Sequence, residues 1–180
     1  MNELLNLVMP PVHPVSVGSD KEWNNIEEKI GINLPEDYKK IVETYGFGSF
    51  NEYFYVLNPF IESPRYLNLI FSCEDFAETL NKQQLVSPLS NTHLKPFNFE
   101  TKKGLMPFIR DEDAGLICWN IDEGEFWNII VLDSSWSKDI LCFEMQTADF
   151  INSLLKGSIE IDFYSSIIEE FLDSPTFQKY

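Results

Sequence analysis

The segment from Trp23 to Phe50 constrains the fold more than any other part of the chain, because it contains two short amphipathic patterns with clear ends. Ser19 has the side chain of a helix N-cap, and Glu22 three residues later completes a capping box. Gly31 can end this first helix in the left-handed backbone conformation. The apolar residues between cap and stop are Trp23, Ile26 and Ile30. Their three- and four-residue spacing predicts one buried helix face.

A second helix is predicted directly after the first. Pro35 suits its first turn, where no amide hydrogen bond has to be donated, and Gly46 suits its end. The apolar stripe between them consists of Tyr38, Ile41, Val42 and Tyr45. We expect the two helices to form a hairpin in which Trp23 and Tyr38 are buried aromatic contacts.

Short β-branched and aromatic runs fill much of the remaining chain. Residues 50–57 form one such run, ended by Asn58 and Pro59, and predict a strand. Four more runs cover residues 106–110, 116–121, 126–132 and 140–145, with acidic or glycine-containing turns at 111–115, 122–124 and 133–135. Short strands with alternating burial and brief turns predict an antiparallel meander between about Met106 and Met145.

Three further helices and a terminal extension are predicted. Ser72 is expected to cap a helix over residues 73–83, and Thr147 one over residues 147–156. Phe163, Ile167 and Phe171, four residues apart, predict a last helix. We therefore expect an α+β protein with three parts: a proline-punctuated lead-in (residues 1–18), one domain (19–157) and a helical extension packed on that domain (158–180).

Three sequence motifs resemble the SUKH superfamily, the Smi/Knr-like proteins. The first runs from Trp23 to Phe50, in the order W-x-x-I-E-x-x-I-G-I-x-L-P-x-D-Y-K and then Y-G-F-G-S-F. The second, Leu105–Ile109, is similar to an L-x-P-F-A element that precedes a strand. The third, Thr147–Leu155, is similar to the closing helix of the family. The resemblance spans Lys21 to about Gly157. One loop departs from the family pattern, because residues 111–115 read D-E-D-A-G where a Gly-Gly-Asp-like loop is usual.

The resemblance implies both a fold and a role. The fold is a mostly antiparallel sheet flanked by helices. Bacterial members of the superfamily are immunity proteins, which are cytoplasmic partners that bind and neutralise a toxin, commonly a nuclease or a deaminase acting on nucleic acid. Some eukaryotic relatives imply a different role, as regulators or scaffolds.

The charge of the chain limits the classes of partner. With 13 basic and 29 acidic residues, the net charge is −16. Such a chain is not expected to bind a nucleic acid backbone or an anionic membrane, because both are polyanions. It suits a cationic protein partner, although acidity can also serve solubility alone.

An acidic cluster surrounds two of the predicted turns and is the candidate partner-binding surface. It consists of Asp111, Glu112, Asp113, Asp122, Glu123 and Glu125, with Trp136 as a candidate exposed anchor. The two turns are expected at opposite ends of one strand, so they flank a sheet face rather than form a point site. The alternative interpretation is a solvated acidic face. Trp119 and Trp127, which lie in predicted strands, are expected to be core residues.

No pattern of catalytic or metal-ligating residues is recognisable. His13 and His93 lie in proline-flanked loops, and no nucleophile elbow or zinc motif is present. The three cysteines lack disulfide spacing, which predicts reduced thiols, with Cys118 and Cys142 as small core residues. Cys73, at the expected start of a helix, could gain thiolate character there.

We accordingly expect no cofactor, no metal, no enzymatic activity and a cytoplasmic location, since no signal peptide or membrane span is recognisable. The rival hypothesis is an enzyme or small-ligand protein whose site is assembled from separate loops and cannot be seen in the sequence.

Overall fold

The computed structural model describes residues 1–82, 94–122, 127–134 and 140–180. A seven-stranded sheet forms its centre, in the order β6-β5-β4-β3-β2-β1-β7, and every neighbouring pair is antiparallel. The strands are β1 (Gly48–Phe50), β2 (Phe54–Val56), β3 (Gly104–Asp111), β4 (Leu116–Ile121), β5 (Asn128–Leu132), β6 (Leu141–Phe143) and β7 (Phe177–Lys179). The α+β class and the meander through β3, β4, β5 and β6 are confirmed.

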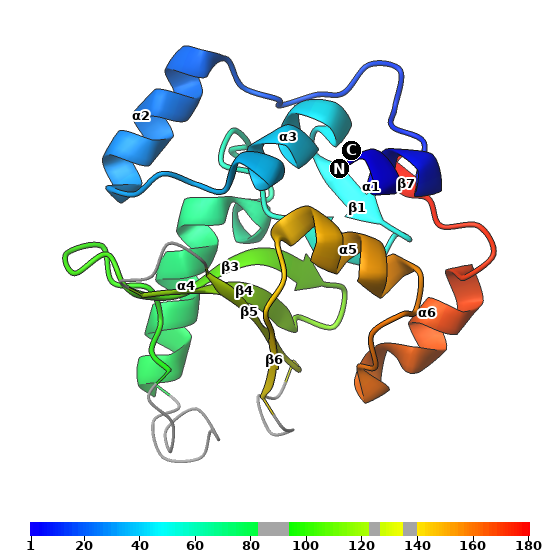
Figure 1. Ribbon diagram of the computed structural model, residues 1–180. Helices are drawn as coiled ribbons and strands as arrows, with labels where there is room; N and C mark the ends of the chain where they lie inside the picture. Colours follow the sequence, from blue (N-terminus) through cyan, green and yellow to red (C-terminus); the bar gives the residue numbers. More distant parts are fainter. Residues whose placement is uncertain (83–93, 123–126, 135–139) are drawn as a thin grey trace.

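Helices cover both faces of this sheet (Figure 1). They are α1 (Asn2–Leu7), α2 (Asp20–Ile30), α3 (Glu36–Tyr45), α4 (Leu69–Lys82), α5 (Thr147–Leu155) and α6 (Ser165–Phe171), with the 3₁₀ turns η1 (Arg65–Leu67) and η3 (Asp162–Tyr164). Alternate residues of β4 belong to two different cores. Leu116 and Cys118 pack with Phe76 and Leu80 of α4. Ile117 and Trp119 pack in the larger core, which includes residues of α3 and α5.

This arrangement corrects the expectation of alternating burial. In β4 both faces are covered, so four consecutive residues from its start are buried. The central strands therefore carry continuous apolar runs, as buried strands do in sheets with helices on both faces.

The predicted helical hairpin is confirmed in its ends and its contacts. Ser19 and Glu22 form a capping box, and Gly31 has a φ of 81° in the left-handed region. The rings of Trp23 and Tyr38 meet edge to face at 6.0 Å, and Trp23 also contacts Phe60 at 4.6 Å. Both aromatic residues of the hairpin are buried, which ties α2 to α3 and to the loop after β2.

The strand predicted over residues 50–57 is a hairpin instead. β1 ends at Phe50 and β2 begins at Phe54. Asn51 and Glu52 lie between the two strands and have φ values of 52° and 53°. This left-handed backbone conformation turns the chain back on itself. The side-chain oxygen of Asn51 also accepts a hydrogen bond from Thr176 N, which holds this turn against the C-terminal segment.

Both ends of the chain contain elements that the sequence analysis did not predict. α1 lies within the lead-in, where Leu4 and Val8 are buried. β7 follows α6 and pairs with β1, so the last segment contributes a strand to the sheet as well as a helix.

Two predictions about individual residues are wrong. α4 begins four residues earlier than expected because Asn68 caps it, its Oδ1 accepting from Ile70 N and Phe71 N at 3.0 Å. Cys73 therefore lies inside the helix, where burial raises the pKa of its thiol rather than favouring a thiolate. Cys142 is exposed, because β6 is an edge strand, whereas Cys118 is buried as expected.

Truncation of Trp23 should destabilise the domain strongly. We expect Trp23→Ala to lower the free energy of unfolding by about 3–5 kcal/mol, since a large aromatic contact with Tyr38 and Phe60 is lost. Urea denaturation measures the change, and Glu28→Ala on the exposed face of the same helix is the matched control. A loss no larger than that of the control would show that the hairpin does not depend on this contact.

Candidate functional site

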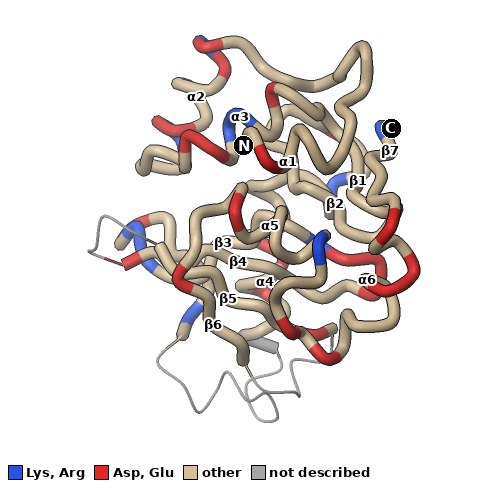
Figure 2. Tube along the Cα trace, turned by 45° about the vertical axis from the view of Figure 1, so that its right-hand side comes forward, with Lys and Arg blue, Asp and Glu red and all other residues tan. Residues whose placement is uncertain are grey.

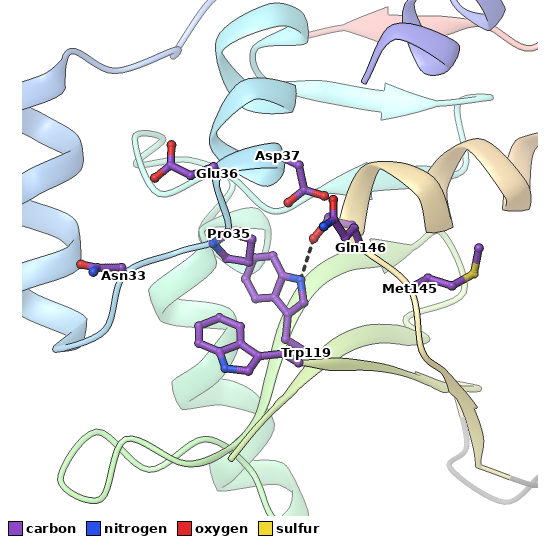
Figure 3. A pocket seen from close by; sticks show the side chains of 9 residues that line it. Asn33, Pro35, Glu36, Asp37, Trp119, Met145 and Gln146 are labelled. Carbon is purple, nitrogen blue, oxygen red and sulfur yellow. Dashed lines mark hydrogen bonds between the residues drawn. The ribbon is translucent and has the colours of Figure 1, made fainter. Parts of the chain in front are cut away.

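A cavity of about 400 Å³ opens between the start of α3, the strands β4 and β5, and the start of α5 (Figure 3). We call it the tryptophan pocket. Its lining residues are Asn33, Pro35, Glu36, Asp37, Trp119, Trp127, Met145, Gln146 and Thr147. Two of these are acidic and none is basic, and the apolar part of the wall is largely aromatic.

Asp37 joins the two helices that border the pocket. Its Oδ2 accepts a hydrogen bond of 2.8 Å from Ala148 N, and its Oδ1 accepts one of 2.9 Å from Tyr38 N. The N-terminus of α5 has no capping hydrogen bond from its own N-cap side chain. The Asp37 carboxylate of α3 accepts a hydrogen bond from one of the free amides of α5 instead. The negative charge at this helix N-terminus is also favourable for the helix dipole.

Trp119 forms the back of the pocket and is fixed by three contacts. Its ring stacks on Phe108 at 4.6 Å and meets Tyr38 edge to face at 4.9 Å. Its Nε1 donates a hydrogen bond of 3.0 Å to Thr147 Oγ1. The hydroxyl that was expected to cap α5 therefore orients the indole instead, and Trp119 is buried as predicted.

Trp127 is the more accessible of the two indoles. It lies directly before β5, is only partly buried, and its ring centre is 6.2 Å from that of Trp119. Together with Met145 it gives the pocket an apolar surface that a partner can reach. Sequence analysis assigned Trp127 to the core, because nothing in its neighbourhood shows that the pocket opens beside it.

Asp111, the first residue of the predicted acidic surface, is buried and structural. Its Oδ1 accepts from Gly115 N and its Oδ2 accepts from Tyr164 OH, both at 2.6 Å. Burial raises the pKa of the Asp111 carboxyl, and it also raises the pKa of Tyr164, which keeps the phenol a donor. The proposed docking role is thus not supported at Asp111, because its side chain closes the turn from inside.

Glu112 and Asp113, the next two residues, are exposed and paired with tyrosines. Glu112 accepts a hydrogen bond of 2.7 Å from Tyr55 OH, and Asp113 accepts one of 2.8 Å from Tyr53 OH. The hydrogen bond to Glu112 is the largest cause that raises the pKa of Tyr55, and burial is the largest for Tyr53. We call these four residues the acid–tyrosine turn.

The other predicted residues fall in two groups. Asp122 is exposed and follows β4, so it lies at the opposite end of that strand from the acid–tyrosine turn, as predicted. A six-residue strand separates them by roughly 20 Å. Glu123, Glu125 and Trp136 lie outside the residues that the structure describes, as does His93.

Sequence reasoning missed Tyr53 and Tyr55 as site residues. Their two-residue spacing within the strand predicted over residues 50–57 was the available signal, because such residues share one face of a strand. The pocket gave no comparable signal, since its residues come from four separate segments.

A comparison with protein families matches residues 20–151 to SUKH_6, described as SMI1-KNR4 cell-wall. The match covers more than two thirds of the chain. The chain belongs to the SUKH superfamily. No curated protein and no solved structure matches it.

The matched part of this SUKH protein contains the whole tryptophan pocket and the acid–tyrosine turn. It leaves out α1, α6 and β7, which the structure places at the ends of the chain. The candidate site therefore belongs to the part of the chain that defines the family.

Acidic charge is concentrated in residues 111–180 of this SUKH protein, which we call the acidic part. Residues 111–180 contain 15 acidic and three basic residues, a net charge of −12 out of the total of −16. Figure 2 shows acidic positions along α6 and on other turns of the acidic part. Two of the four residues of the acid–tyrosine turn, Glu112 and Asp113, and five of the nine residues that line the tryptophan pocket belong to the acidic part.

Two kinds of site were not found in the described parts of the chain. Within these ranges there is no group of three or more His, Cys, Asp or Glu side chains placed to hold a metal ion. No helix among the described residues is long and apolar enough to cross a membrane.

The buried carboxylate of Asp111 gives a testable pH dependence. Its pKa in the folded chain lies above the ordinary value of 3.8, so its contribution to stability is complete below that value and is lost as the pH rises through the folded-state pKa. We therefore expect the destabilisation caused by Asp111→Asn to be largest at acidic pH and to shrink toward neutral pH. Urea unfolding of both proteins between pH about 3 and about 7 measures this difference. A cost that grows with pH would show that the carboxylate is stabilised in its charged form.

Proposed function

We propose that this protein is an immunity protein that acts in the cytoplasm by binding and neutralising a cationic protein toxin. The observation that carries the proposal is membership of the SUKH superfamily together with the strongly acidic part of the chain, residues 111–180, which contributes to the candidate site. The proposed toxin class is a nuclease or a deaminase acting on nucleic acid, and the chain itself is proposed to have no enzymatic activity.

Electrostatics supports this class of partner. An enzyme that grips nucleic acid presents a basic groove to the phosphate backbone. A protein that covers such a groove associates faster when its own surface has the opposite charge. Glu112 and Asp113 suit this task because they are exposed and are held in place by tyrosine hydroxyls, so little side-chain freedom is lost on binding.

The tryptophan pocket offers apolar contacts to a partner, which the charged residues do not. Interface residues that slow dissociation are commonly aromatic side chains at the centre of a contact, surrounded by polar groups. Trp127 and Met145 offer such a surface, with Glu36 and Gln146 exposed at its rim. Glu36 also forms an ion pair with Lys39. The side chain of Glu36 is the more exposed of the two.

The first experiment identifies the partner. The protein is purified with its binding partners from the native cell, and the toxin encoded beside it is expressed separately as an inactive variant. Recovery of a basic toxin domain supports the proposal. A purified chain that turns over a nucleotide, peptide or sugar substrate without a partner would favour the rival enzyme hypothesis.

Neutralising the acid–tyrosine turn should slow association with the toxin. In the double variant Glu112→Gln and Asp113→Asn, each new side chain can still accept the tyrosine hydrogen bond, so the fold should survive. We expect the association rate in stopped flow to fall about tenfold at low salt and to differ little at high salt. The matched control is Glu62→Gln and Glu100→Gln, two exposed acids that lie outside residues 111–180. Equal rates for both double variants would move the docking surface away from this turn.

Truncation of Trp127 should act on dissociation instead. We expect Trp127→Ala to raise the dissociation rate at least about tenfold with little change in the association rate, because an apolar anchor is lost while the charges remain. Surface plasmon resonance at two salt concentrations separates the two rates. A slower association with unchanged dissociation would contradict an anchoring role for the pocket.

A further inference from the structure

An uncharged segment precedes the SUKH domain of this otherwise highly charged chain. Residues 4–19 contain no Asp, Glu, Lys or Arg, although these types make up 42 of the 180 residues. Several large apolar side chains of this segment are exposed. They are Leu5, Met9, Val12 and Val15, which we call the terminal patch. Met9 is 86% exposed and Val12 is 88% exposed, so these two side chains contribute almost nothing to the core of the chain.

The terminal patch is fixed in position. Tyr45 OH donates hydrogen bonds to Leu4 O and Val8 O, and both of these residues are buried. Val15 O accepts a hydrogen bond of 2.9 Å from Phe47 N, directly before β1. The apolar side chains are therefore exposed on an ordered backbone, and a partner that covers them meets a surface already in place.

The edge of the sheet lies beside this patch. Lys179 of β7 reaches His13 O with its Nζ, at 3.2 Å. Tyr45 links the two segments as well, because its hydroxyl donates to Leu4 O and Val8 O while its ring lies 5.0 Å from that of Phe177 in β7. The last segment, residues 174–180, contains no acidic residue and one basic residue.

β7 leaves one side of its backbone open. Tyr180 N donates to Phe47 O, and Thr176 O accepts from Asn51 N, so positions 176, 178 and 180 face β1. In an antiparallel pair the positions between them point to the other side. The backbone groups of Phe177 and Lys179 thus point to the sheet edge, and the structure gives them no backbone partner in the described ranges. Lys179 O accepts one weak hydrogen bond of 3.3 Å from the exposed Gln178 Nε2, which a second strand can displace.

We propose that two copies of the chain associate through this region, with β7 of one copy pairing antiparallel with β7 of the other. A twofold axis at Gln178 places Phe177 opposite Lys179 of the second copy, so the open donors and acceptors of both strands are satisfied. The terminal patch of each copy is covered in the same contact. The result is one continuous sheet across two SUKH domains.

The open edge of β7 is self-complementary, which favours a second copy as the occupant, and the distribution of charge favours this region as the contact. Two chains with a net charge of −16 each repel one another wherever acidic faces meet. Residues 4–19 and 174–180 contain none of the 29 acidic residues, so the copies meet where neither segment adds a negative charge. An exposed apolar patch beside an open strand edge is also the combination that promotes pairing between chains. Because the approach of two acidic chains is opposed at long range, added salt should strengthen the dimer.

Sedimentation velocity of the full chain, over a wide range of protein concentration and at low and high salt, tests the proposal. We expect a monomer–dimer equilibrium whose dissociation constant falls with added salt. Val12→Glu should raise this constant at least about tenfold, since it places a charge in the interface without removing any core contact. Lys179→Pro removes an outward N–H while leaving the bonds to β1, and it should weaken the dimer in the same way. Lys179→Ala, which removes only the side-chain bond to His13 O, is its control and should weaken the dimer less. Circular dichroism checks that all of these variants remain folded.

The matched control is Leu172→Glu, an exposed apolar residue of the acidic C-terminal extension that lies outside the terminal patch. It should dimerise as the unsubstituted chain does. A chain that remains monomeric at the highest concentration and salt overturns the proposal. So does a dimer that Val12→Glu and Lys179→Pro leave intact, or one that Leu172→Glu dissociates.

Discussion

The indole of Trp119 holds the layers of this protein together. It stacks on Phe108 within the sheet, meets Tyr38 of α3 edge to face, and donates a hydrogen bond to Thr147 at the start of α5. Asp37 adds a second link between the same two helices through Ala148 N. These contacts set the spacing between the first turns of α3 and α5, and that spacing is what opens the tryptophan pocket. The pocket is thus a consequence of core packing, which makes it available before any partner arrives.

Local signals explain which parts of the fold could be predicted from the sequence. The capping box at Ser19 and the left-handed stop at Gly31 act within a few residues, so the helical hairpin was predicted correctly. β7 has no such signal. It is three residues long, contains a lysine, and exists because it pairs with β1, which lies more than one hundred residues earlier. Tertiary pairing of this kind cannot be derived from the pattern of a short segment.

The candidate site shows the same limit at the level of single residues. Asp111, Glu112 and Asp113 are consecutive acids, and no local pattern distinguishes the buried one from the two exposed ones. The structure separates them because Asp111 is the last residue of β3 and points inward to Gly115 and Tyr164. Its neighbours point outward to tyrosines of the adjacent hairpin. The tryptophan pocket could not be predicted, because its lining residues come from four segments that are distant in the sequence.

Two surfaces with different chemistry result from this fold. We propose a cationic partner for the acid–tyrosine turn and the tryptophan pocket, and a second copy for the terminal patch, which is free of acidic residues. Hydrogen exchange of the protein, alone and in complex with the proposed toxin, tests the toxin-binding account most directly. The account predicts slower amide exchange at residues 33–37, 112–115 and 145–148 in the complex, with no change in α4. Protection confined to α4, or no complex at all, would contradict it.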